Sequence, residues 1–212
     1  MNPESGRSAP RSAASDDPPP RAWQRMLSGR RLDLLDPSPL DIEIEDIAHG
    51  LARVARWNGQ TTGAYGLSVA QHSVIVEALV ARNRPVPPLR WRLAALLHDA
   101  PEYVIGDMIT PFKTALGDGY RGIEDRLMRA VHIRFGLPPV LPEEVAKMIK
   151  RADKTAAFSE AVSLAGFSEP DARRILGYRR RAFIPVASEP PEVAKRQFLE
   201  RFARLYPKGT AS

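Results

Sequence analysis

Apolar residues recur three and four positions apart along most of this sequence from about residue 41 onward, which is the spacing of an amphipathic α-helix. The first such stretch, residues 41 to 56, carries the stripe Ile44, Ile47, Leu51 and Val54. The spacing predicts five further helices: from Ser68 as N-cap, from 89 to 103, from about 123 to 131, from Pro142 to about 164, and from Pro191. Strands do not alternate with helices and no Gly-rich phosphate loop is present, so the sequence predicts an all-α helical bundle.

The two ends of the chain differ from this helical region. Residues 1 to 26 are rich in Pro, Ser, Ala and Arg without periodicity, which indicates a disordered leader. Residues 29 to 39 are extended in character and are broken by prolines, so we expect a short extended segment or a β-hairpin there. One helical domain over residues 27 to 206 follows from the length, with a tail at 207 to 212.

Composition excludes several classes of protein. The chain has no cysteine, so it has neither disulfides nor thiolate metal sites. It has no apolar run long enough to span a bilayer and no secretory signal, so we expect a cytoplasmic protein without a membrane partner. The net charge of +6 comes from the two ends, while the middle is slightly acidic. We therefore do not expect nucleic acid as a partner.

Four polar residues fall on the apolar sides of the predicted helices: His72, His98, Asp99 and Asp153. Taken singly, each is more often a core histidine or a surface ion pair than a ligand. Buried carboxylates are costly unless a cation compensates them, and two imidazoles with two carboxylates suit a divalent transition metal such as Mn, Co, Fe, Ni or Zn better than Mg. The set predicts a catalytic metal site with positions left for water and substrate. His49 and His132 lack such carboxylate partners and are expected to be structural.

The order of these residues resembles the defining motif of the HD superfamily of metal-dependent phosphohydrolases, which has an all-helical fold. Two segments, RWNGQTTGAYGLSVAQHS and HDAPEYVIGDMITPFK, are similar to the bacterial 5′-deoxynucleotidase branch and its prophage-encoded relatives. The resemblance covers residues 28 to 165. It implies an HD-type helical domain and a hydrolase that removes the phosphate from deoxyribonucleoside 5′-monophosphates.

The resemblance also implies roles for single residues. The four residues above match the metal ligands. Glu102 matches the catalytic acid, and it was expected on the same side of the helix as the histidine four residues before it. Arg56 matches the residue that orients the substrate phosphate, and Trp57 the one that screens the sugar. Asp107 and Thr110 match sugar and phosphate contacts.

Other functions in this superfamily remain open. A dNTP triphosphohydrolase would share the metal core, and a non-catalytic module could bind a nucleotide or a metal through it. A guanosine tetraphosphate hydrolase is less favoured because Glu102 is followed by Tyr103 instead of a second acid, and a cyclic-dinucleotide phosphodiesterase because its Gly-Tyr-Pro signature is missing. We expect a small nucleotide as substrate and a homodimer as the assembly.

Overall fold

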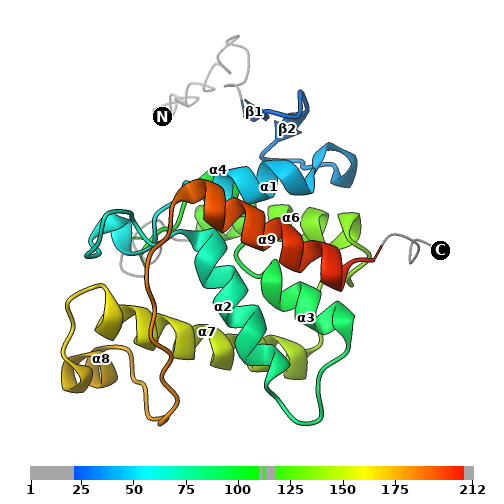
Figure 1. The fold of residues 1–212 in the computed structure, drawn as a ribbon. Coiled ribbons are helices and arrows are strands. Elements are labelled where there is room, and N and C mark those ends of the chain that lie inside the picture. The colour runs from blue at the N-terminus through cyan, green and yellow to red at the C-terminus, as the bar shows by residue number, and fades with distance from the viewer. Residues whose placement is uncertain (1–21, 110–111, 113–117, 208–212) are drawn as a thin grey trace, which may run out of the picture.

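The computed structural model describes residues 22–109, 112 and 118–207. This part of the chain is mostly helical with one small antiparallel sheet, which confirms the predicted all-α fold with a short hairpin (Figure 1). The helices are α1 (Ile44–Leu51), α2 (Val69–Ala81), α3 (Leu89–Leu96), α4 (Glu102–Ile105), α6 (Asp118–Arg134), α7 (Glu143–Ser163), α8 (Glu169–Ile175) and α9 (Pro191–Leu205). Two short 3-10 helices, η1 (Pro39–Asp41) and η2 (Arg56–Gly59), lie beside α1.

Helix α2 is the centre of the fold. It contacts α1, α3, α7 and α9, and Figure 1 shows it between α9 and α7. Ser68 caps it with a reciprocal capping box to Gln71, as the sequence predicted for its N-terminus. Because helices pack on several of its sides, α2 buries polar residues as well as apolar ones: Gln71, His72, Ser73 and Glu77. Each of these polar groups needs a partner inside the protein.

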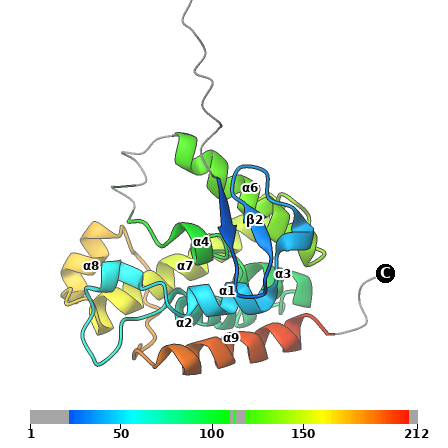
Figure 2. The ribbon, with the colours of Figure 1, turned by 90° about the horizontal axis from the view of Figure 1, so that it is seen from above.

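The N-terminal hairpin consists of β1 (Trp23–Arg25) and β2 (Arg31–Asp33). The loop between them is held on α1, because the amide and hydroxyl groups of Ser28 both donate to Asp46. Figure 2 shows the hairpin from above. Strand β1 lies within residues 1 to 26, the range expected to be a disordered leader, so regular structure begins before residue 27. Residues 1 to 21 lie outside the described residues.

The helix predicted over residues 41 to 56 ends earlier than expected. Helix α1 stops at Leu51, and Arg56 lies in η2. The reason is a pairing that the local pattern does not reveal: Val54 accepts from Val69 N, and Arg56 N donates to Leu67 O at 2.7 Å. This bridge draws the chain away from the helix and places Arg56 beside the start of α2.

The prediction of one continuous helix over residues 89 to 103 is wrong. Helix α3 ends at Leu96, and a new short helix, α4, begins at Glu102. Pro101 lacks a backbone N–H and disfavours helical geometry in the residue before it, so the helix cannot continue through it. His98 and Asp99 therefore lie in a turn between α3 and α4, and Glu102 is not one helical turn along a continuous helix from His98.

The remaining predicted helices are present. They correspond to α6, to α7 starting after Pro142, and to α9 starting at Pro191. Helix α8 was not predicted, although Ser168 as N-cap and Pro170 at its first turn are start signals. Within the described ranges, none of the helices has both the length and the apolar character needed to cross a bilayer.

Candidate metal centre

Three segments bring the four predicted ligand residues together. His72 comes from α2, His98 and Asp99 from the turn after α3, and Asp153 from α7. Ligand atoms of His72, His98 and Asp153 lie within 4.8 Å of one another. Asp99 joins them, because its Oδ2 atom is 3.2 Å from His98 Nε2 and 3.5 Å from His72 Nε2. This group of side chains could hold a metal ion.

The two imidazoles present the same ring nitrogen to this cluster. His72 Nδ1 lies 2.5 Å from Glu160 Oε1, and His98 Nδ1 lies 2.9 Å from the carbonyl oxygen of Ala95. Both Nδ1 partners are acceptors, so each Nδ1 carries a hydrogen and donates it. The Nε2 atoms of both rings are buried and have no hydrogen-bond partner among the described residues. Two Nε2 lone pairs facing two carboxylates are the donor set of a divalent transition metal.

The charges in this cluster shift the proton affinities strongly. Burial and Arg56 act to lower the pKa of His72, but the carboxylates of Glu160 and Asp153 outweigh them and raise it to about 10. Burial opposes ionisation of Asp99 and Asp153, yet the nearby histidines hold the pKa of both carboxyls below the ordinary range. The cluster therefore attracts positive charge at the point where the ligand atoms meet: either a second proton on His72 Nε2, or a cation that displaces this proton and takes the lone pair.

Arg56 lies next to the cluster and is held by two carboxylates. Its Nη1 is 3.1 Å from Asp107 Oδ2, and its Nε and Nη2 are each 3.4 Å from Glu160 Oε2. Burial lowers the pKa of Arg56, but Glu160 and Asp107 outweigh it and raise the pKa above its ordinary value. A permanently charged, oriented guanidinium thus lies beside the candidate ligands, and Asp107 is brought to the same place.

Trp57 lies in a tight turn of left-handed backbone. Trp57 and Asn58 have φ values of 58° and 51°, a backbone region that residues other than glycine rarely adopt. The indole Nε1 donates to Glu160 Oε2 at 3.1 Å, and the ring packs against Phe167. The turn fixes the guanidinium and the indole in neighbouring positions on one carboxylate.

Glu102 begins α4 and is buried, with 3% of its surface exposed. Its backbone N–H donates to the carbonyl oxygen of Asp99 at 3.0 Å, which ties it to the turn that carries the ligands. Its charge acts on Arg56, so the two side chains share one electrostatic environment. Thr110, the last of the predicted site residues, lies outside the described residues.

Glu160 was not among the predicted site residues, although it is fully buried and contacts His72, Arg56 and Trp57. Burial opposes its ionisation, but His72 and Arg56 hold its pKa down at about 2. A signal was present in the sequence. Glu160 follows Asp153 by seven residues, two helical turns, and so falls on the same inward side of α7.

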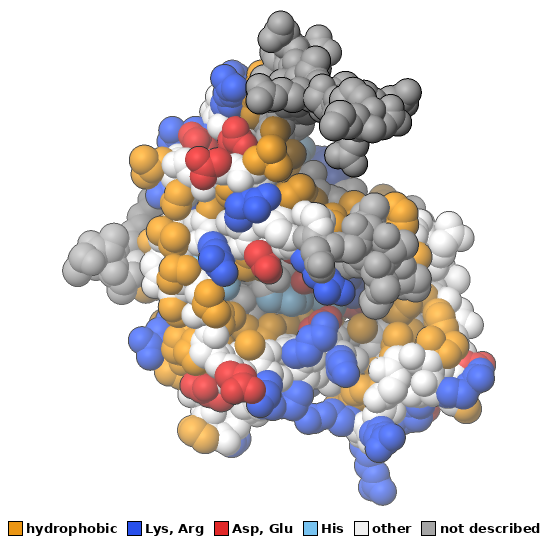
Figure 3. Space-filling model, turned by 180° about the vertical axis from the view of Figure 1, so that it is seen from behind, with side chains coloured by type: hydrophobic (Ala, Val, Ile, Leu, Met, Phe, Trp, Pro, Cys, Tyr) orange, Lys and Arg blue, Asp and Glu red, His pale blue; other side chains and the backbone are white. Residues whose placement is uncertain are grey.

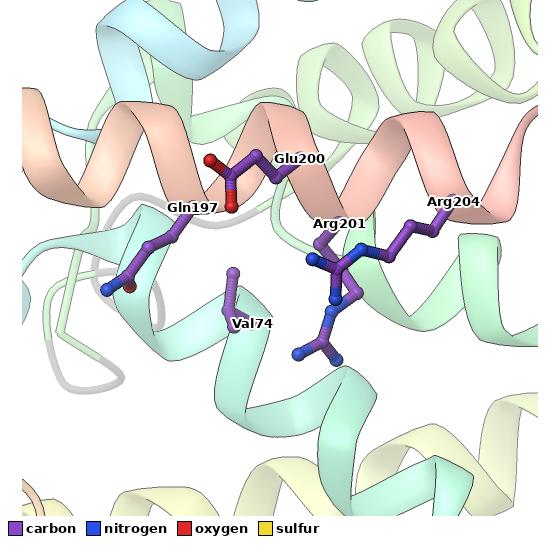
Figure 4. A pocket seen from close by; sticks show the side chains of 5 residues that line it. All are labelled: Val74, Gln197, Glu200, Arg201 and Arg204. Carbon is purple, nitrogen blue, oxygen red and sulfur yellow. The ribbon is translucent and has the colours of Figure 1, made fainter.

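The face of the molecule opposite to the view of Figure 1 contains a hollow. Figure 3 shows histidine side-chain atoms at the base of this hollow, with Lys and Arg side chains along its rim. Lys150 pairs with Asp153 at 2.7 Å across the edge of the cluster. A separate cavity of about 190 Å³ lies between α2 and α9 (Figure 4) and contains none of the candidate ligands. It is lined by Val74, Gln197, Glu200, Arg201 and Arg204.

The sequence of the chain is similar to those of known proteins. No family model matches it. An uncharacterized protein of Rhodobacter capsulatus is 69% identical over 157 residues, which cover 74% of this chain and 80% of that protein. The uncharacterized protein YfdR of Escherichia coli K12 is 36% identical over 114 residues, which cover 53% of this chain and 58% of YfdR. The chain belongs to the same protein family as the Rhodobacter capsulatus protein.

Proposed function

We propose that the protein is a metal-dependent phosphohydrolase of the HD type that removes the phosphate from deoxyribonucleoside 5′-monophosphates. One observation carries the proposal: two histidine Nε2 atoms that have no hydrogen-bond partner among the described residues face two carboxylates, beside an arginine whose side chain is only 14% exposed. The ligand atoms suit a divalent cation, and the arginine suits a phosphate. The sequence resemblance to the deoxynucleotidase branch supplies the substrate class.

The cation would be held by His72, His98, Asp99 and Asp153. Mn, Co, Fe, Ni or Zn fits this mixed nitrogen and oxygen set better than Mg. When bound, such an ion polarises a phosphoryl oxygen and lowers the pKa of a coordinated water.

Arg56 binds and orients the phosphate in this proposal. Glu160 occupies the edge of the guanidinium formed by Nε and Nη2, and Asp107 takes one hydrogen of Nη1. Among the described residues this leaves one N–H on Nη1 and one on Nη2, which can donate to phosphoryl oxygens. An ammonium group lacks this planar pair of donors, so the geometry favours arginine over lysine.

Glu102 transfers the proton in this proposal. It lies at the start of α4, next to the turn that carries His98 and Asp99, and it is shielded from bulk water. A carboxyl group in this place can donate a proton to the departing 5′ oxygen of the nucleoside, a role that contributes roughly 10²- to 10⁴-fold in rate.

The sugar side of the pocket is assigned to Trp57 and Asp107, as the resemblance implies. The indole N–H of Trp57 is engaged by Glu160, so Trp57 offers the nucleoside its ring instead of a hydrogen-bond donor. Asp107 is paired with Arg56 through Oδ2. A sugar hydroxyl can therefore donate only to the carboxylate lone pairs that this ion pair does not use.

The test is a panel of nucleoside mono- and triphosphates, assayed with Mn²⁺, Co²⁺ and Mg²⁺ for released phosphate, pyrophosphate and triphosphate. We expect phosphate release from deoxyribonucleoside 5′-monophosphates. Asp99→Ala should lose both metal and activity, whereas Glu102→Gln should keep metal and lose activity. Glu144→Gln, on the exposed first turn of α7, is the matched control.

Three results would contradict the proposal. Release of triphosphate from dNTPs would identify a triphosphohydrolase instead. Absence of turnover on every substrate, with metal bound, would identify a non-catalytic binding module. Parent activity in Asp99→Ala would show that the ligand assignment is wrong.

A further inference from the structure

Glu160 has an unusual set of partners for a fully buried carboxylate. Its Oε1 atom faces His72 Nδ1 at 2.5 Å, while its Oε2 atom accepts from Trp57 Nε1 and from two nitrogens of Arg56. Every one of these partners belongs to the candidate site. A buried ionised carboxylate is costly, and within the described part of the chain the hydrogen bonds to this one come from groups that the proposed reaction uses.

We infer that Glu160 is a positioning residue that orients both the metal-binding nitrogen of His72 and the phosphate-binding N–H groups of Arg56. The inference rests on the proposed function, because it takes a divalent cation and a phosphate as the ligands of this site. Glu160 itself touches neither; it acts through His72 and Arg56.

Glu160 determines which ring nitrogen of His72 carries the hydrogen. An ionised carboxylate only accepts, so Glu160 requires His72 to carry a hydrogen on Nδ1. The lone pair of Nε2 is then left for the cation. A glutamine at position 160 cannot serve both sides: with its amide nitrogen toward His72 it favours the wrong tautomer, and with its oxygen there it turns two hydrogens toward the donors of Arg56 and Trp57.

Glu160 also fixes the orientation of the Arg56 guanidinium. A single oxygen, Oε2, accepts from Nε and Nη2 along one edge of the guanidinium. The same oxygen accepts the indole N–H of Trp57, whose backbone is in the left-handed region. The carboxylate therefore holds both the arginine and the turn that carries it, and the guanidinium is kept in one orientation.

A purely structural role is the competing explanation, and the chain offers a matched control for it. Glu77 is also fully buried, lies on α2 five residues after His72, and pairs with two arginines, Arg92 at 2.7 Å and Arg201. Figure 4 shows Arg201 reaching from α9 toward α2. Glu77 contacts no candidate ligand, so its loss reports the cost of removing a buried carboxylate alone.

The experiment measures Co²⁺ binding to the full-length chain by competition with a chromophoric chelator. We expect Glu160→Gln to weaken Co²⁺ binding roughly 10- to 100-fold, as loss of an outer-shell carboxylate typically does. Glu77→Gln should lower the melting temperature and keep the parent Co²⁺ affinity. Parent affinity in Glu160→Gln, or an equal loss in Glu77→Gln, would overturn the inference. If Glu160→Gln does not fold, Glu160→Asp takes its place, and parent affinity would again overturn it.

The arginine half is tested with inorganic phosphate on the protein saturated with Co²⁺. Glu160→Gln should bind phosphate at least several-fold more weakly, whereas Glu77→Gln should bind it like the parent. Unchanged phosphate affinity in Glu160→Gln would overturn this half. Both readouts are binding measurements, so a failure of nucleotide turnover would contradict the proposed function and leave this inference intact.

Discussion

The Nδ1 atom of His72 lies 2.5 Å from the Oε1 atom of Glu160, and both side chains are completely buried. One residue comes from the central helix α2 and the other from the long helix α7, 88 positions later. This contact determines which nitrogen of His72 faces Asp99 and Asp153, and so it determines what the cluster can bind.

Metal should stabilise the folded protein through this cluster. With Co²⁺ at about 100 times its dissociation constant, the expected gain in the free energy of unfolding is about 2.7 kcal/mol. Thermal melts with Co²⁺ and with excess chelator measure it. His98→Gln should lose most of the shift, and Glu144→Gln should keep it. An equal shift in His98→Gln would show that the ion binds elsewhere.

Arg56→Lys should separate phosphate binding from metal binding. The lysine keeps the positive charge but cannot satisfy Glu160 and Asp107 and also present two parallel donors. We expect Co²⁺ affinity close to the parent value and at least roughly tenfold weaker binding of inorganic phosphate, about 1.4 kcal/mol. Titration calorimetry on the Co²⁺-loaded protein measures the second quantity. Parent phosphate affinity would remove Arg56 from the phosphate site.

Glu77 should be important for stability and not for the site. Its carboxylate joins α2 to Arg92 on α3 and to Arg201 on α9. Glu77→Ala leaves Arg92 and Arg201 without this partner; because their side chains are 23% and 25% exposed, we expect a loss of about 3 kcal/mol, the lower end of the range for breaking a buried pair. Urea denaturation at neutral pH measures the loss. A change below about 1 kcal/mol, the range of surface ion pairs, would show that water compensates the arginines.

Protonation of His132 should make the protein less stable in mild acid. Its Nδ1 lies 3.3 Å from the carbonyl oxygen of Pro139, and burial lowers its pKa although that carbonyl opposes the shift. A lowered pKa in the folded state means that its contribution to stability is present above about pH 6.5, the value in the unfolded chain, and is lost as the pH falls toward the folded value. His132→Gln should flatten the decline of the melting temperature from about pH 8 to about pH 5.5. A decline as steep as that of the parent would show that other groups cause it.

Substitutions of Asn58 should measure the free-energy cost of the left-handed turn next to Arg56. Its side chain is exposed and its φ is 51°. A β-branched residue is strongly disfavoured in this region, so Asn58→Val should lower the free energy of unfolding by about 1–2 kcal/mol, whereas Asn58→Gly should change it little. Chemical denaturation of both variants measures this. Equal stability of the two would mean that the turn relaxes to another conformation.

The candidate site was predictable from the sequence to the extent that it depends on helical periodicity. His72 and Asp153 could be placed because α2 and α7 are continuous helices, in which the spacing from apolar neighbours fixes the side on which a residue lies. Glu102 was less predictable. Pro101 interrupts the helix before it, so its position relative to His98 follows from the turn and not from a helical repeat.

The sequence by itself determined the all-helical fold, the capped start of α2, and the set of nitrogen and oxygen atoms available for a metal, because these follow from residue types and short-range spacing. Only the tertiary structure decided which groups meet. The pairing of Arg56 with Leu67 ended α1 early, and the packing of α7 on α2 brought Glu160 against His72. Such contacts join residues far apart in the chain, and their energy depends on burial and on the neighbouring charges, which no local pattern contains.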